Sequence, residues 1–200
     1  MFSALCRRLL PLALSAGFVF TAAPAISALG DTANAQARHI ATFFPGRMTG
    51  SPAEMLSADY LRQQFTQMGY ESDIRSFNTR YIYTNNDNRK NWQNVTGSTV
   101  IAAHEGKDRQ QIIIMAHLDT YAPQTDADIE NNLGGLTLQG IDDNALGLGA
   151  MLELAEQLKN IPTRYGIRFV ATSGEEEGRL GAQNMLKRRS EEHTSELQSQ

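Results

Sequence analysis

Apolar side chains recur at helical spacing in the segment between Ser51 and Gly69. Ser51 is suited to cap a helix, Pro52 suits the first turn, and Glu54 lies three residues after Ser51, as a capping box requires. Gly69 follows the last apolar residue and is suited to end the helix. The repeating apolar positions are Tyr60, Leu61, Phe65 and Met68. The pattern predicts one amphipathic helix in this segment.

Other segments have the patterns of β-strands. Residues 70–77 and 99–103 are predicted strands, and the polar stretch from Thr84 to Asn91 is predicted to be a loop between them. Residues 111–116 and 165–172 are short runs rich in apolar side chains. Such runs suit strands that are buried on both faces of a parallel sheet.

Helical patterns alternate with the later strands. Residues 144–159 are a predicted helix with an apolar side, and residues 181–188 begin another. The order strand, helix, strand, helix predicts an α/β fold with a largely parallel sheet. No internal repeat or linker interrupts the pattern, so we expect one domain.

Residues 1–28 have the layout of a secretory signal peptide. Two arginines at positions 7 and 8 precede an apolar run from Leu9 to Phe20, and small residues follow. The run is twelve residues long, whereas a helix that crosses a bilayer needs about 20. We therefore expect an exported protein without a stable membrane anchor. The candidate cleavage sites follow Ala25, Ala28 and, more distantly, Ala35.

The composition is that of an ordinary globular protein and excludes some classes of function. The 200 residues include 18 Lys+Arg and 22 Asp+Glu, which gives a formal charge of −4. No basic block provides the electrostatic footprint that nucleic-acid binding needs, so we expect no nucleic-acid partner. The single cysteine, Cys6, lies in the predicted signal peptide. The mature chain is therefore expected to have neither a disulfide nor a cysteine nucleophile.

Residues 189–200 differ in character from the rest of the chain. They contain one apolar side chain, Leu197, and no periodicity, so their composition predicts a disordered tail. The string from Arg189 to Ser199 also resembles the conceptual translation of a DNA sequencing adapter. We therefore expect a non-native tail after Arg188 and a chain that is truncated at its C-terminus.

Three polar clusters lie where strands of such a sheet end, which is where open α/β sheets collect functional groups. His117 and Asp119 follow the strand at 111–116 and project to the same side of an extended chain. Residues 140–145 place two acids at the start of a helix, and residues 173–178 place three glutamates after the last strand. Each cluster also has a plainer interpretation: a surface histidine, a helix cap and a solvated run of charge.

Taken together, the three clusters have the ligand chemistry of a divalent metal such as zinc. One imidazole and several carboxylates are ligands that zinc accepts. Consecutive carboxylates repel one another unless a cation or a basic group lies among them. A two-metal site also needs a bridging carboxylate and a nearby acid that activates bound water. The paired acids of the second and third clusters are candidates for those roles.

The order of these motifs resembles a known family. His117-Leu118-Asp119, the segment Gly140 to Ala145 and Glu175-Glu176 are similar to the signature of the co-catalytic zinc aminopeptidases, metallopeptidase family twenty-eight. The resemblance extends over residues 36–188. The di-zinc carboxypeptidases and deacylases share the first and third motifs, but their middle Asp is usually followed by Lys-Gly. The aminopeptidases are therefore the preferred family, and they imply a three-layer sandwich of the zinc-exopeptidase type.

The resemblance assigns a role to each motif residue. It implies that His117 binds one of two zinc ions, that Asp143 bridges both, and that Glu176 binds the second. It makes Glu175 the general base and Asp119 the residue that orients His117. No role follows for the acids Asp142 and Glu177, or for Trp92 and the insert at 121–139. By analogy, the peptide bond between Asp143 and Asn144 is expected to be cis.

The implied activity is hydrolysis of the first peptide bond of substrates with a free N-terminus, with a basic first residue preferred. The family pattern also requires a later Asp and a later His. Residues 178–200 contain no Asp, and His193 lies in the adapter-like tail. The chain thus supplies three of the five expected ligands. Two alternatives remain: a non-catalytic relative or inactive fragment used for binding, and a mono-zinc glutaminyl cyclase of the same fold.

Overall fold

The structure is a computed structural model that describes residues 28–198, with side chains described through Arg189. The predicted signal peptide therefore lies almost entirely outside the described residues. None of the helices within 28–198 has the length and apolar character needed to cross a membrane. The elements in chain order are α1 (Asp31–Phe43), α2 (Pro52–Gln67), β1 (Glu71–Thr84), β2 (Lys90–His104), β3 (Asp108–His117), α3 (Asp126–Glu130), a π-helical turn η1 (Ile141–Ala145), α4 (Leu146–Leu158), β4 (Tyr165–Thr172) and α5 (Leu180–Gln198).

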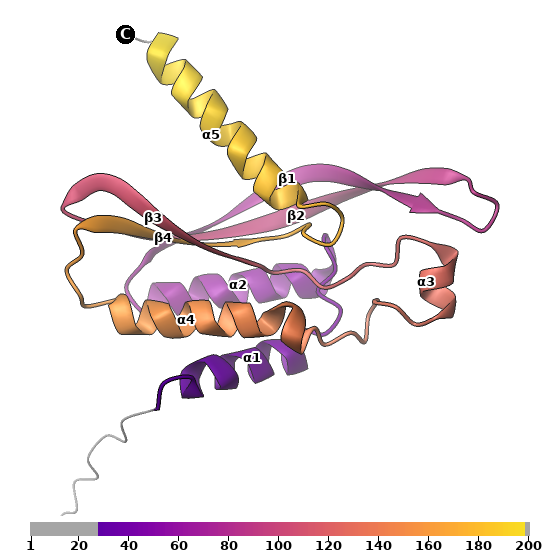
Figure 1. Cartoon of the computed structure of the whole chain (residues 1–200), viewed down its shortest axis with the longest axis horizontal. Helices are drawn as coiled ribbons and strands as arrows, with labels where there is room; N and C mark the ends of the chain where they lie inside the picture. Colours follow the sequence, from indigo (N-terminus) through magenta and orange to yellow (C-terminus); the bar gives the residue numbers. More distant parts are fainter. Residues whose placement is uncertain (1–27, 199–200) are drawn as a thin grey trace, which may run out of the picture.

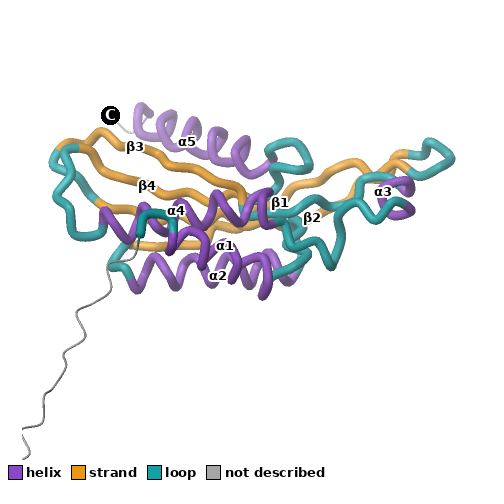
Figure 2. The backbone as a smooth tube through the Cα atoms, turned by 60° about the horizontal axis from the view of Figure 1, so that its bottom comes forward, coloured by secondary structure: helices purple, strands orange, loops and turns teal. Residues whose placement is uncertain are grey.

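The described strands form one sheet between two layers of helices, as the three-layer α/β prediction requires. Helices α1, α2 and α4 cover one face of the sheet, and α5 lies on the other (Figures 1 and 2). The strand order is β1-β2-β4-β3. The prediction of a mostly parallel sheet is wrong for these strands, because only β3 and β4 pair in parallel and the other two pairings are antiparallel.

The long hairpin of β1 and β2 explains much of the antiparallel pairing. The loop predicted over residues 84–91 is shorter, because Thr84 pairs with Lys90 and Tyr83 pairs with Asn91 across the hairpin. A two-strand hairpin needs only a short turn, whereas parallel neighbours need a long crossover. Near the hairpin tip, Arg80 lies 4.2 Å from the ring centroid of Trp92, which is 53 % exposed.

The core lies between the sheet and the layer formed by α1, α2 and α4. Phe65 of α2 stacks on Phe169 of β4 with ring centroids 5.5 Å apart, and both are fully buried. Helix α1 packs closely on α4 at Gly149, where a Cβ atom would lie 2.3 Å from the Ala33 carbonyl oxygen. Only glycine allows that approach. This packing holds the N-terminal end of α4, and with it one motif of the site.

Helix α2 confirms the predicted cap, but its capping box is only half formed. Ser51 Oγ accepts a hydrogen bond from the Glu54 main-chain N at 3.1 Å, and Pro52 is the first residue of the helix. Gly69 follows the helix with φ +90°, in the left-handed region that glycine favours. The Glu54 carboxylate does not return to the helix end, because it hydrogen-bonds Ser98 and Ser173 of the sheet side instead.

Two predicted helix boundaries differ from the structure, and two helices were not predicted. Helix α4 begins at Leu146 rather than at residue 144, because η1 occupies Ile141–Ala145. Helix α5 continues to Gln198. The prediction of a disordered tail is therefore wrong for residues 189–198. This segment contains strong helix formers such as Glu, Leu and Gln. Helices α1 and α3 were not predicted, and the candidate cleavage site after Ala35 falls inside α1.

Strand β3 is exposed, although its apolar sequence predicts burial on both faces. Ile112 is 51 % and Met115 is 49 % exposed, because β3 is the outer strand of the described sheet and pairs only with β4. Strand β4, which lies between β2 and β3, is buried as predicted. An apolar outer strand is a template for pairing with another chain.

We therefore expect the isolated 200-residue chain to self-associate through β3. Replacing Ile112 by Lys should shift the population toward monomer, because a charge on an outer strand opposes edge-to-edge pairing. The measurement is size-exclusion chromatography with light scattering. Ile161→Lys is the matched control, since Ile161 is 49 % exposed but lies after α4 and outside the sheet. A monodisperse monomer for the unmodified chain would contradict this prediction.

Candidate metal centre

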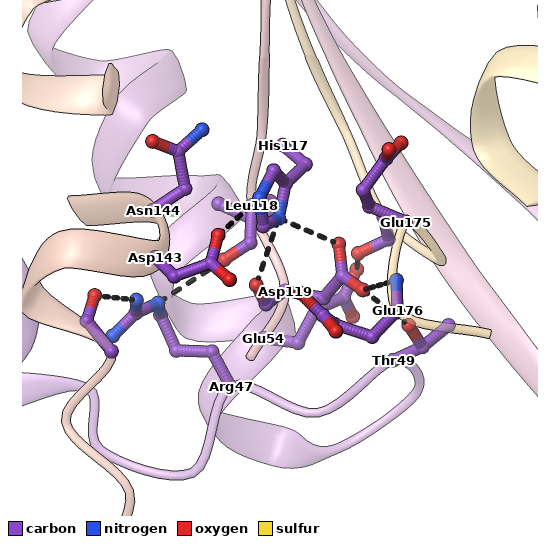
Figure 3. A network of polar contacts seen from close by, with 12 residues as sticks. Arg47, Thr49, Glu54, His117, Leu118, Asp119, Asp143, Asn144, Glu175 and Glu176 are labelled. Carbon is purple, nitrogen blue, oxygen red and sulfur yellow. Dashed lines mark hydrogen bonds and ion pairs between the residues drawn. The ribbon is translucent and has the colours of Figure 1, made fainter. Parts of the chain in front are cut away.

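Three segments that are far apart in the sequence meet at one end of the sheet. His117 is the last residue of β3, and Glu175 and Glu176 lie in the turn after β4. The Leu118 main-chain N donates a hydrogen bond to the Thr172 carbonyl at 2.7 Å, so the first two segments stay adjacent. Asp143 lies in η1, at the start of α4. The predicted location at the carboxyl ends of neighbouring strands is confirmed (Figure 3).

The side chains of His117, Asp143 and Glu176 converge. One potential ligand atom from each lies within 4.8 Å of the others. The peptide bond between Asp143 and Asn144 is cis, as the resemblance implies. One imidazole nitrogen and two carboxylate oxygens are the donor set that zinc takes in proteins without thiol ligands. The residues present therefore fit a zinc ion.

The ring of His117 is oriented so that one nitrogen faces Asp143. Its Nδ1 lies 3.1 Å from the Asp119 carbonyl oxygen, which can only accept a hydrogen bond, so Nδ1 carries a proton. The Nε2 atom lies 2.8 Å from Asp143 Oδ1. Burial lowers the pKa of His117, but the contact with Asp119 and the charges of Asp119 and Asp143 outweigh burial and raise it to about 9. The surrounding acids thus favour the positively charged form of the ring.

Asp119 links the histidine segment to the glutamate segment. Its side chain is fully buried, and Oδ2 accepts hydrogen bonds from Thr49 Oγ1 at 3.3 Å and from the Glu176 main-chain N at 3.2 Å. Its Oδ1 lies 3.6 Å from His117 Nδ1. The ring is therefore oriented by the hydrogen bond that its Nδ1 donates to the Asp119 carbonyl. The Asp119 carboxylate positions the Glu176 main chain.

Glu175 and Glu176 line an open pocket of about 630 Å³ together with His117 and Asp143. Burial and the charge of Asp143 raise the pKa of Glu176. Glu175 Oε1 lies 3.4 Å from Arg179 Nε, and the Glu175 side chain is 35 % exposed. The pocket thus combines a potential metal-binding face with a carboxylate that is accessible to water and substrate.

The two acids without a predicted role lie outside the converging group. Asp142 is exposed and lines a neighbouring pocket of about 570 Å³ that also includes Asp143. Glu177 Oε2 accepts a hydrogen bond from Thr49 Oγ1 at 2.8 Å. Burial, with the charge of Asp119, raises the pKa of Glu177 to about 7. The insert at 121–139 contacts the glutamate segment, because Gln124 Nε2 donates to the Glu176 carbonyl at 2.9 Å.

The structure also reveals a supporting residue that was not predicted. Arg47 is fully buried just below the site (Figure 3). Burial lowers its pKa to about 10, against the opposing effect of the Asp119 charge. Its guanidinium donates four hydrogen bonds to carbonyl oxygens, those of Leu118, Phe44, Gln139 and Gly140. Arg47 thus ties the histidine segment to the segment that carries Asp143. No motif marks it, because its partners Gln139 and Gly140 are more than 90 residues away.

The sequence profile of Peptidase family M28 matches residues 99–199. The chain belongs to this family, which confirms the resemblance. It is 74 % identical over 191 residues to the alkaline phosphatase isozyme conversion protein of Escherichia coli, covering 96 % of this chain and 55 % of that protein. The chain therefore spans about half the length of that relative.

Solved structures with the same fold include enzymes of two kinds. A glutaminyl cyclase of Fimbriiglobus ruber superposes with a TM-score of 0.59 at 23 % identity, over 74 % of this chain and 46 % of that one. A Zn-dependent exopeptidase of Parabacteroides distasonis superposes with a TM-score of 0.54 at 24 % identity, over 74 % of this chain and 48 % of that one. These likenesses establish the zinc-exopeptidase fold.

Proposed function

We propose that the full-length protein is an exported zinc-dependent aminopeptidase. In this proposal the chain supplies the N-terminal part of that protein, with three of its five metal ligands. The observation that carries the proposal is the convergence of His117, Asp143 and Glu176 within 4.8 Å. Membership of a peptidase family agrees with it. In this proposal His117 would hold one zinc ion, Glu176 would hold a second, and Asp143 would be the carboxylate shared by both.

Bound zinc is a Lewis acid that lowers the pKa of a coordinated water and polarises a carbonyl. The chain's own residues supply the rest of the chemistry. The carboxylate of Glu175 takes a proton from the attacking water and returns it to the leaving amine. Asp119 holds the ring of His117 through its carbonyl and the Glu176 main chain through its carboxylate. These contacts keep the ligands oriented before substrate binds.

The proposed substrates are peptides or proteins with a free N-terminus and a basic first residue. The Escherichia coli relative is named for the conversion of alkaline phosphatase isozymes, and we extend that partner to this protein, with N-terminal arginine as the residue released. The signal-peptide pattern of residues 1–28 supports export to the periplasm. Alkaline phosphatase in that compartment is therefore the proposed partner.

The deciding experiment compares two reactions of the purified full-length protein with and without zinc. Zinc-dependent release of arginine from an arginyl amide or peptide supports the aminopeptidase. Cyclisation of an N-terminal glutamine without amide hydrolysis would instead assign the protein to the glutaminyl cyclases. Zinc binding with neither reaction would favour a non-catalytic relative.

We expect the isolated 200-residue chain to bind zinc weakly and to show no turnover. It supplies three of the five ligands that the family pattern requires, so each zinc ion would have only the bridging carboxylate and one other protein ligand. Structural zinc sites use four ligands and catalytic sites three. The measurement is zinc titration with a competing chelator, together with an arginyl-amide assay. Stoichiometric tight binding with turnover would contradict the ligand assignment.

A further inference from the structure

Glu54 is a buried carboxylate that the proposed chemistry does not use. It lies in the first turn of α2 and is 1 % exposed. Its main-chain N is held by Ser51 Oγ at 3.1 Å, so the residue is fixed at both its backbone and its side chain. A carboxylate away from water is unfavourable unless hydrogen bonds satisfy it. Helix capping explains the contact of the Glu54 main chain but not the burial of its carboxylate.

Three hydrogen bonds from serines satisfy the Glu54 carboxylate. The Ser98 main-chain N donates to Oε1 at 2.8 Å and Ser98 Oγ donates to Oε2 at 3.4 Å. Ser173 Oγ donates to Oε1 at 2.5 Å, the shortest of the three. Both serines are buried, Ser98 in β2 and Ser173 just after β4. Burial raises the pKa of Glu54, and the hydrogen bonds from Ser173 and Ser98 oppose that rise.

Ser173 is the last residue before the turn that carries the two catalytic-site glutamates. Its main-chain N donates to the Ser98 carbonyl at 3.1 Å, and its carbonyl accepts from the Gly181 main-chain N at 2.9 Å. The next residue, Gly174, has φ +81°, and a Cβ atom there would lie 2.8 Å from Leu180 Cβ. These contacts tie the turn to β2 and to the start of α5, so a shift of Ser173 would shift the turn with it.

We propose that Glu54 is a positioning residue that, through Ser173 Oγ, fixes the turn from which Glu175 and Glu176 reach the metal centre. The proposal rests on the proposed function, because that function gives the two glutamates their roles. Figure 3 shows Glu54 in the same network as Asp119 and Glu176. Glu54 lies in α2 and is not among the residues that line the pocket.

The test compares Ser173→Ala with Ser98→Ala in the full-length protein. Each variant removes one hydroxyl donor to the same carboxylate, but only Ser173 continues into the turn. For Ser173→Ala we expect kcat and zinc affinity to fall about 10- to 100-fold, as for other residues that support metal ligands, with KM nearly unchanged. For Ser98→Ala we expect little change in either quantity. Hydrogen exchange of residues 173–181 in the metal-free protein should accelerate in Ser173→Ala alone.

Two variants at Glu54 separate positioning from simple stability. The amide oxygen of Glu54→Gln still accepts from Ser98 N and Ser173 Oγ, so this variant should keep most of the activity, whereas Glu54→Ala should lose it as Ser173→Ala does. Equal effects of Ser173→Ala and Ser98→Ala, or unchanged exchange in the turn, would overturn the proposal. If the unmodified protein hydrolyses no peptide, the proposed function fails, while exchange and zinc affinity still decide the role of Glu54.

Discussion

If the proposed function holds, replacing Glu175 by Gln in the full-length protein should abolish peptide hydrolysis and leave zinc affinity nearly unchanged. Glu175 lines the pocket beside His117, Asp143 and Glu176 but is not among the converging ligand atoms. An amide has the shape of the carboxylate but cannot take a proton from water. General bases contribute about 10²- to 10⁴-fold to rate, so kcat should fall by at least about 100-fold. The measurement is steady-state arginyl-amide hydrolysis beside a zinc titration.

The control for this experiment is Glu130→Gln, which removes one exposed carboxylate in α3, away from the pocket. It should leave both kcat and zinc affinity unchanged. The variant Glu175→Gln also loses the 3.4 Å contact with Arg179. Because that contact is solvent-exposed, it should contribute little to stability. Hydrolysis that survives in Glu175→Gln would remove Glu175 from the role of general base.

Replacing Arg47 by Met should lower the free energy of unfolding more than any other single change proposed for this protein. Methionine has a similar length but no donor, so the carbonyls of Leu118, Gln139 and Gly140 lose hydrogen bonds in a buried place. It also leaves the charge of buried Asp119 without its nearby guanidinium. Removing one member of a buried charged network costs about 3–5 kcal/mol. Urea denaturation of the metal-free protein, followed by circular dichroism, measures the loss.

The matched control is Arg62→Met on the surface of α2. Arg62 forms an exposed ion pair with Asp59 at 2.8 Å, so its loss should change stability by less than about 0.5 kcal/mol. Zinc affinity of Arg47→Met should fall as well, because the two segments that Arg47 joins carry His117 and Asp143. A loss of stability below about 1 kcal/mol would be inconsistent with four hydrogen bonds that matter individually.

The three polar clusters that contain the candidate ligands could be predicted from the sequence because their chemistry is local, whereas the choice of one ligand in each cluster came from the resemblance to the family. His117, Asp143 and Glu176 each follow an apolar strand or precede an apolar helix, and the carboxyl ends of adjacent strands meet at one edge of a sheet. Helix α2 was predictable for a similar reason, since Ser51, Pro52 and Gly69 act within one turn of its ends. Patterns of this kind depend on neighbours in the chain, which a sequence displays directly.

The supporting contacts could not be predicted, because they join residues that are distant in the sequence. Helix α1 has no side-chain cap of its own; instead, Glu153 of α4 accepts hydrogen bonds from the main-chain N atoms of Gly30 and Ala33. The position of Glu54 matches the capping-box pattern, yet its carboxylate accepts a hydrogen bond from Ser173, which is 119 positions away. Arginine is usually exposed in folded proteins, yet Arg47 is fully buried.

The sequence by itself determined the α/β class, the position of most helices and strands, and the three polar clusters from which the converging ligand atoms come. The tertiary structure decided which strand lies at the outer position, and therefore that β3 is exposed and that the described sheet is mixed. It also decided which polar side chains are buried to hold the ligand segments in place. Periodicity and local motifs report how a residue relates to its chain neighbours, whereas burial and strand order depend on contacts that form only when distant segments pack together.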